Sequence, residues 1–234
     1  MTTVVVLQPS YLPWLGFFDQ MMRSDVFVFY DDVQFNKNGW RNRNRIKSST
    51  EVQWITVPVI HKNIRRPLIN EIRIDNSQKW GHKHITSIKQ NYSKSPFLSL
   101  YLPELDDVLS KRWSFLVDLD LALIELICNW LSITPNIKLS SELKIYGDKS
   151  ERLLKICKYF DANVYLSGNA AESYLDENLF SKNEIMVEWH DYKHPVYQQL
   201  YGGFTPYLSI IDLIFNNGSK SAEIIHNKEF LRSN

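Results

Sequence analysis

The amino-acid sequence predicts an α/β fold, with a mixed, partly parallel sheet covered by helices and Rossmann-like alternation of strand and helix at both ends of the chain. Strand-like and helix-like segments alternate near each terminus. The 234 residues can bury one large core, whereas two domains would each be thin. Hydrophobic residues make up 44% of the chain and charged residues 23%, which are ordinary globular values. We therefore expect one domain over residues 1–234.

The N-terminal segments predict two parallel strands joined through a helix. Residues Thr3 to Leu7 are apolar and β-branched, as in a buried strand, and the prolines of Pro9 to Pro13 require a loop. Leu15 to Arg23 has the pattern of a helix, and Asp25 to Tyr30 that of a second strand. Because a helix separates them, the two strands should pair in parallel.

The middle of the chain predicts two further strands followed by helices. The segment Asn36 to Lys47 is polar and basic with little periodicity. Gln53 to Pro58 and Asn70 to Ile74 have the pattern of strands, which would make the sheet mixed. Apolar residues then recur at helical spacing in Gln78 to Tyr92, Leu98 to Lys111 and Ser114 to Leu131.

The βα alternation resumes near the C-terminus. Lys149 to Phe160 is an amphipathic helix, with Asp148 as its expected N-cap. Strands are expected at Asn163 to Leu166 and Glu184 to Trp189. Closing helices are expected at Ser209 to Asn216, which ends at Asn217-Gly218, and at Ser219 to Ile225.

Composition favours a cytoplasmic protein that acts on a small substrate. The 27 Lys and Arg against 26 Asp and Glu leave no general positive field for an extended nucleic acid. No secretion signal is recognised at the N-terminus, and charges interrupt the apolar stretch Phe115 to Ile133, so no membrane contact is expected. Cys128 and Cys157 lie in helix-like apolar segments, which predicts unpaired core thiols.

The first strand-to-helix connection is the leading candidate for a ligand site. Open α/β sheets bind ligands at the carboxyl ends of their strands, which places Gln8, Tyr11, Trp14 and Gly16 at such a site. The alternative is a rigid aromatic loop that caps the core.

Asp31 and Asp32 end the second predicted strand at the same edge. Paired carboxylates could hold Mg²⁺, position a sugar hydroxyl or act as a general base. The alternative is a turn in which the aspartates bond to their own backbone.

Three arginines stand at every second position: Arg41, Arg43 and Arg45. If this segment is extended, they share one face, with Asn42 and Asn44 on the other. Guanidinium groups in such a row suit a pyrophosphate or carboxylate. A nucleic-acid backbone, or an edge strand that carries charge to prevent aggregation, are the alternatives.

Other candidate groups are more dispersed. Ser167 and Gly168 follow a short strand and could present backbone N–H groups to a phosphate or oxyanion, with Tyr174 facing the same crevice, or they could form an ordinary turn. His84, on an amphipathic helix, is a polar contact or a base. The histidine spacing predicts no metal site, and the motifs of hydrolases, P-loop ATPases and dehydrogenases do not occur.

Taken together, these motifs resemble the WbqC-like family of bacterial proteins. The resemblance rests on Gln8 to Phe18, Asp25 to Gln34, Asn42 to Ile46, Tyr165 to Gly168, Tyr174, Tyr197 to Gln199 and Ser209 to Leu213 before Asn217-Gly218. It implies a product of an O-antigen or other surface-polysaccharide locus that transfers glycine or another amino acid to an amino sugar. Many relatives have His or Met where this chain has Leu7, so a histidine at that position is not available here.

The leading hypothesis is an enzyme that acylates the amine of a nucleotide-linked amino sugar. Asp31 or Asp32 would be the base or a sugar anchor, Arg43 and Arg45 would hold the pyrophosphate, and backbone groups of Ser167-Gly168 would stabilise an oxyanion. Gln199 would add a substrate contact. The rival is a non-catalytic protein that binds the nucleotide sugar for a partner enzyme. The sequence identifies no cofactor or acyl donor and leaves open a charged tRNA and the formation of oligomers.

Overall fold

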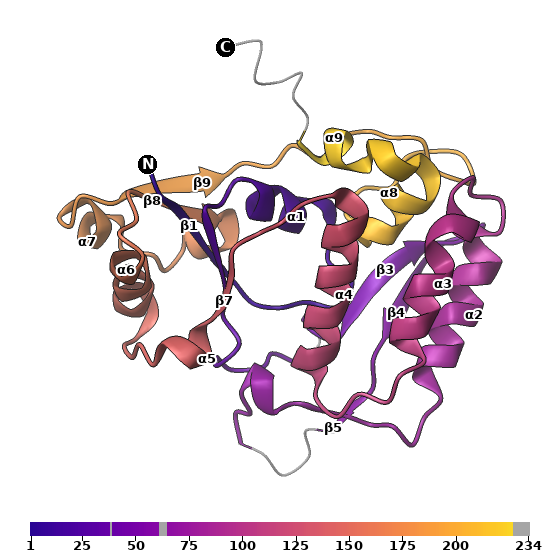
Figure 1. Cartoon of the computed structure of the whole chain (residues 1–234), viewed down its shortest axis with the longest axis horizontal. Helices are drawn as coiled ribbons and strands as arrows, with labels where there is room; N and C mark the ends of the chain where they lie inside the picture. Colours follow the sequence, from indigo (N-terminus) through magenta and orange to yellow (C-terminus); the bar gives the residue numbers. More distant parts are fainter. Residues whose placement is uncertain (38, 61–64, 227–234) are drawn as a thin grey trace. The chain divides into compact units, whose positions relative to one another are not determined.

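The computed structural model describes residues 1–37, 39–60 and 65–226 (Figure 1). Its contacts divide the chain into two compact units, which are described separately. The first unit contains Met1–Gln8, Asp19–Asp32 and Thr134–Lys193. The second contains Pro9–Phe18, Val33–Ile133 and the chain from His194 onward.

The first unit is built on a five-stranded, fully parallel sheet in the order β7-β2-β1-β8-β9. Its strands are β1 (Thr3–Leu7), β2 (Val26–Phe29), β7 (Ile137–Leu139), β8 (Val164–Gly168) and β9 (Met186–His190). Numbered within the sheet alone, the order is 3-2-1-4-5, which is that of Rossmann-like folds. The direction of strand addition therefore reverses between β1 and β8, and ligands bind such sheets at the carboxyl ends of the strands beside this point.

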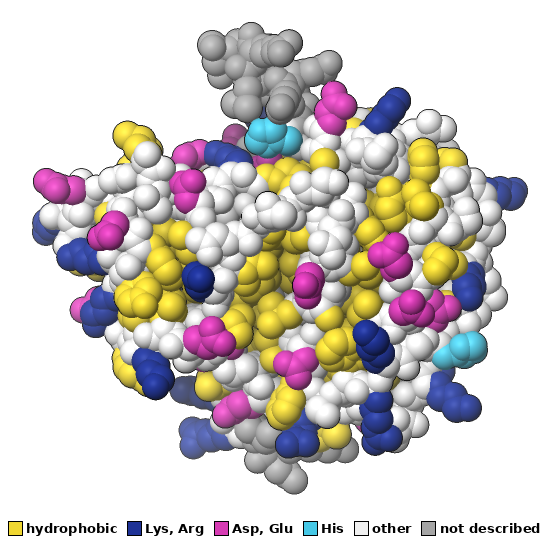
Figure 2. Space-filling model, viewed as in Figure 1, with side chains coloured by type: hydrophobic (Ala, Val, Ile, Leu, Met, Phe, Trp, Pro, Cys, Tyr) yellow, Lys and Arg dark blue, Asp and Glu magenta, His cyan; other side chains and the backbone are white. Residues whose placement is uncertain are grey.

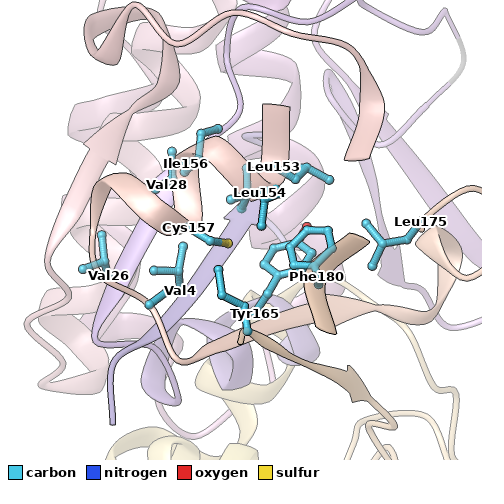
Figure 3. Close-up of a cluster of buried hydrophobic side chains, with 13 residues drawn as sticks. Val4, Val26, Val28, Leu153, Leu154, Ile156, Cys157, Tyr165, Leu175 and Phe180 are labelled. Carbon is cyan, nitrogen blue, oxygen red and sulfur yellow. The ribbon is translucent and has the colours of Figure 1, made fainter. Parts of the chain in front are cut away.

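Helices cover the sheet because its central strands are apolar on both faces. All four residues of β2 are buried, as are the three central residues of β1. Figure 3 shows one of the two faces, where side chains from β1, β2 and β8 meet those of α6 (Lys149–Tyr159) and α7 (Glu177–Ser181). In this cluster the rings of Tyr165 and Phe180 stack with centroids 5.2 Å apart. Each such buried side chain contributes about 1.5–3 kcal/mol.

The second unit combines a β-hairpin with a group of helices. Strands β3 (Arg43–Lys47) and β4 (Val52–Thr56) pair antiparallel, with Arg45 opposite Trp54. Helices α2 (Trp80–Tyr92) and α3 (Leu98–Leu109) lie side by side in Figure 1. The remaining elements are β5 (Val59–Ile60), β6 (Arg73–Ile74), α4 (Leu116–Leu131), α8 (Ile210–Asn217) and α9 (Ser221–His226), with short 3-10 turns at Ile69–Glu71 and Gly218–Lys220.

The predicted α/β fold, with a partly parallel sheet covered by helices, is confirmed. The sheet was expected to be mixed, but the five-stranded sheet is fully parallel and the antiparallel pairs lie in separate sheets. Helix α1 (Leu15–Met22) and α2, α3, α4, α6, α8 and α9 lie where the periodicity predicts them, within about two residues at each end. Helix α8 ends at Asn217 and is followed by Gly218, whose φ is +57°. An added Cβ on Gly218 would lie 2.7 Å from the Phe97 ring, so only glycine fits at this helix end.

Several elements differ from the expectation. The segment Asn36 to Lys47 contains strand β3, and the residues that follow β8 form a 3-10 turn (Asn169–Ala171) and helix α7. Strand β7 and helix α5 (Ser140–Leu143) are too short to show a period in the sequence. Asp148 occupies the N-cap position of α6 without a side-chain capping bond.

The cysteine prediction is confirmed. Cys128 and Cys157 are both free and buried. Burial raises the pKa of each thiol to about 12, so neither is present as a reactive thiolate at neutral pH. Among the described helices, none has the length and apolar character needed to cross a bilayer.

Candidate functional site: the carboxyl edge of the parallel sheet

Polar side chains gather where the strands of the parallel sheet end. Because all five strands run in the same direction, their carboxyl ends share one edge of the sheet. A polar residue ends or directly follows three of the strands, stands one position before the end of β8, and comes two positions after β2. These residues are Gln8 after β1, Asp31 after β2, Ser140 after β7, Ser167 near the end of β8 and His190 at the end of β9.

Hydrogen bonds to Asp31 connect the end of β2 to the residues that follow β7. Its carboxylate accepts hydrogen bonds from the Ser141 backbone N–H at 3.0 Å, the Ser141 hydroxyl at 2.6 Å and the Ser140 hydroxyl at 3.0 Å. The Asp31 side chain thereby satisfies backbone and hydroxyl donors at the start of α5. These bonds occupy the carboxylate with structural partners.

Asp32 forms an ion pair with Arg152 of helix α6. The Arg152 Nη2 to Asp32 Oδ2 distance is 2.5 Å, and the two side chains are 10% and 19% exposed. Arg152 also donates from Nε to the Ile145 carbonyl at 2.8 Å and lies 4.8 Å from the centre of the Tyr30 ring. Burial raises the pKa of the Tyr30 hydroxyl, although Arg152 opposes that shift.

Gly168 leaves open space beside the switch point of the sheet. A Cβ built on Gly168 would have no atom within 4 Å, and its φ of −71° is accessible to any residue. The glycine is therefore not required by packing or by backbone strain, whereas a ligand that approaches the backbone closely would require it. The neighbouring Ser167 is buried, and Tyr174 is half-exposed.

His190 and Asp19 form a buried couple at the end of β9. His190 pairs in register with Gly168 on the adjacent strand. Its Nε2 lies 2.7 Å from Asp19 Oδ2, and the two side chains are 2% and 7% exposed. Because a carboxylate only accepts, the geometry assigns the proton to Nε2. In the neutral imidazole, Nδ1 then carries the lone pair.

The aspartates that follow β2 and the histidine that ends β9 differ in the chemistry that they can perform. Asp31 and Asp32 are occupied by hydroxyl, backbone and guanidinium donors. The His190 imidazole has Nε2 fixed by a carboxylate, which is the arrangement of a general base with an orienting partner. His190 is the group at this edge best arranged to accept a proton.

In the second unit, the predicted residues Tyr11 and His84 form a buried chain of hydrogen bonds. His84 Nε2 lies 3.2 Å from the Thr56 carbonyl, so it carries the proton, and Nδ1 accepts from the Tyr11 hydroxyl at 2.8 Å. Tyr11 is fully buried. Burial lowers the pKa of His84 to about 4. A base role for His84 remains a prediction.

Stability should therefore fall on acidification because of His84. An unfolded histidine binds its proton below about pH 6.5, whereas folded His84 does so only near pH 4, so the unfolded state gains protons between these values. We expect this group to cost about 3 kcal/mol of unfolding free energy between pH 7 and pH 4. Urea unfolding of wild type and His84→Gln across this range measures the difference. The exposed control His82→Gln should keep the pH dependence of the wild type. The assignment is contradicted if His84→Gln has the same pH dependence as the wild type, or if the dependence is lost in His82→Gln and kept in His84→Gln.

The aromatic loop owes its form to local packing within the second unit. An added Cβ on Gly16 would lie 2.3 Å from the Trp14 ring, so glycine lets the indole lie against the backbone. The Trp14 ring is 5.4 Å from that of Tyr207 and 6.3 Å from that of His194. Asn44 donates to the Leu12 carbonyl at 2.7 Å and fixes Leu12 in a left-handed conformation with φ of 44°.

The expected row of three arginines begins at Arg43, since β3 starts there and Arg41 precedes it. Arg41 instead donates to the Pro9 carbonyl at 3.1 Å. Arg43 and Arg45 do share a face of the hairpin, with the Trp54 ring centre 4.3 Å and 5.8 Å from their guanidinium carbons. Asn42 lies buried and donates to the Val57 carbonyl at 2.8 Å.

Gln199 holds a turn of its own segment. It accepts from Lys47 Nζ at 3.1 Å and from the Thr205 backbone N–H at 2.9 Å, and donates to the Thr205 carbonyl at 2.9 Å. These bonds fix the segment between Gln199 and Thr205. Its role in substrate binding remains a prediction.

The structure brings together part of the predicted site. Within the first unit it places Gln8, Asp31, Asp32, Ser167 and Gly168 at one edge of the sheet. Tyr174 also belongs to the first unit. The other predicted residues belong to the second unit: Tyr11, Trp14, Gly16, Asn42, Arg43, Arg45, His84 and Gln199. The expectation that residues 8–16, 31–32 and 43–45 share one crevice joins both units and remains a prediction.

Four residues of this edge were not predicted from the sequence: Asp19, Ser140, Arg152 and His190. Asp19 lies in a helix and His190 in a strand, 171 residues apart, so no spacing connects them. The available signal was the position of His190 at the end of a predicted strand, where the crevice rule applies as it did to Asp31. Arg152 offered a weaker signal, a charge among the buried residues of α6.

Fold and site together define a Rossmann-like α/β protein whose parallel sheet ends in a polar edge. The chain belongs to the WbqC-like protein family, whose model matches residues 8–224. It is also similar to a protein of Mycobacterium tuberculosis, "Uncharacterized protein Rv1507c", with 38% identity over 227 residues, which is 96% of this chain and 98% of that protein. No solved structure matches the chain significantly.

Proposed function

We propose that this protein is an enzyme of bacterial surface-polysaccharide biosynthesis that transfers an aminoacyl group, or another acyl group, to the amine of a nucleotide-linked amino sugar. Membership of the WbqC-like family supports the pathway, and the polar carboxyl edge of the sheet supports a small-molecule site there. The single observation that carries the proposal of catalysis is the His190–Asp19 couple beside Gly168.

The proposed reaction joins the sugar nitrogen to the acyl carbon. The amine attacks the carbonyl of an activated acyl donor, a C–N bond forms, and the bond from the acyl carbon to the leaving group breaks. His190 Nδ1 takes the amine proton and returns it to the leaving group, while Asp19 stabilises the imidazolium.

Mass spectrometry of dTDP- and UDP-amino sugars tests the proposal. The sugars are incubated with the protein, ATP and amino acids, with and without charged tRNA. The expected result is a product whose mass exceeds that of the sugar by one acyl group. The rival function, a binding protein for a partner enzyme, predicts saturable binding of the nucleotide sugar with no change in its mass.

A further inference from the structure

Two tryptophans are exposed side by side on the hairpin of the second unit. Trp40 and Trp54 are each 43% exposed, and their ring centres are 5.2 Å apart with an angle of 36° between the rings. Indole rings bury large apolar areas when they are packed, so an exposed pair is costly unless something covers it. Trp54 lies on β4, and Trp40 precedes β3.

Two guanidinium groups accompany the tryptophans. Arg43 lies 4.3 Å from the centre of the Trp54 ring, and Arg45 lies 5.3 Å from that of Trp40. Arg45 also donates to the Tyr207 carbonyl at 2.9 Å and forms no ion pair with any residue that the structure describes. A guanidinium that stacks on an indole can still donate from its edge to a phosphate.

We propose that Trp40, Trp54, Arg43 and Arg45 form a site for a nucleoside diphosphate, in which the base stacks on the indoles and the guanidinium groups hold the phosphates. The site deepens the proposed function, on which it rests, since the nucleotide is the carrier part of the sugar substrate. The aromatic and cationic groups match the two chemical parts of this ligand.

The net charge of the chain and the small number of binding groups favour a nucleotide over an extended nucleic acid. The chain carries a net charge of +1. On the one face of the molecule that Figure 2 shows, basic and acidic side chains are interspersed. A single strand of nucleic acid requires a continuous positive track along its backbone. Two indoles and two guanidinium groups suffice for one base and its two phosphates.

Calorimetric titration of the full-length protein with UDP, dTDP, uridine and inorganic pyrophosphate tests the site. Trp54→Ala should weaken UDP binding by about 5- to 150-fold, the usual contribution of a base–aromatic stack, and leave pyrophosphate binding unchanged. Arg45→Gln should weaken the binding of both UDP and pyrophosphate. Trp54→Phe keeps a ring and should stay close to wild type. Trp130→Ala, which removes a half-buried tryptophan of α4, is the matched control.

Three results would overturn the site. These are unchanged UDP binding in folded Trp54→Ala and Trp40→Ala, equal weakening in Trp130→Ala, and binding of an oligonucleotide in preference to UDP with a steep salt dependence. If Trp54→Ala fails to fold, Trp40→Ala still tests whether UDP binding depends on the indole pair. Nucleotide binding through Trp54 without acyl transfer contradicts only the proposed reaction, whereas acyl transfer that is indifferent to Trp54 and Trp40 contradicts only this site.

Discussion

Replacing His190 with glutamine is expected to lower acyl-transfer turnover by about 10²- to 10⁴-fold, the usual contribution of a general base. Glutamine keeps a polar side chain of similar length but cannot accept the amine proton at neutral pH. The substrate-binding groups remain, so the Michaelis constant should change little. Steady-state kinetics with the nucleotide amino sugar separates the two parameters, and circular dichroism checks that the variant is folded.

Asp19→Asn distinguishes a positioning role from a merely structural one. Asparagine can accept the hydrogen bond from His190 Nε2 but brings no charge to stabilise the imidazolium, so turnover should fall with binding retained. The pH profile of turnover should also shift, which a loss of packing alone would not cause. His82→Gln, an exposed histidine of α2, should behave as wild type. Normal turnover in folded His190→Gln would remove this couple from the mechanism.

The fold was predictable wherever a segment had a hydrophobic period of its own or was bounded by residues that start or end a helix or strand. The apolar run of β1 and the helical spacing of α4 each identify an element without reference to the rest of the chain. The short β7 has no such signal, because its three residues are ordered only by pairing with β2. Strand β3 was missed for another reason: Asn44 faces the interior, where its amide bonds to the loop carbonyls of Tyr11 and Leu12.

The candidate site was predictable only in its location. The crevice rule placed Gln8, Asp31 and Gly168 at the carboxyl edge of the sheet from their positions after strands. What each side chain does there depends on partners distant in sequence. The partner of Asp32 is 120 residues away and that of His190 is 171 residues away. For this reason the aspartates, which looked available in the sequence, are engaged in the structure, while the histidine was overlooked.

Removing the charge of Arg152 is expected to destabilise the first unit by about 3 kcal/mol, because it leaves Asp32 as a largely buried carboxylate without its counterion. Arg152→Met keeps the length and the apolar contact with Tyr30 while removing the donors. Urea unfolding monitored by circular dichroism measures the change. Lys155→Met is the matched control on the same helix, since Lys155 and its partner Glu151 are 52% and 62% exposed with N and O 3.9 Å apart. That exposed pair should contribute at most about 0.5 kcal/mol.

The double variant Asp32→Asn/Arg152→Met identifies the source of the loss. If an uncompensated buried charge causes it, neutralising Asp32 in the Arg152→Met background should recover part of the stability, and the two substitutions will not be additive. Asp32→Asn alone also tests the aspartate as a base, because an anchoring role predicts reduced stability with turnover retained in the folded fraction. A loss of turnover by about 10²-fold or more in folded Asp32→Asn, with His190→Gln active, would return the base to Asp32. Equal destabilisation by Arg152→Met and Lys155→Met would show that the ion pair with Asp32 contributes nothing specific.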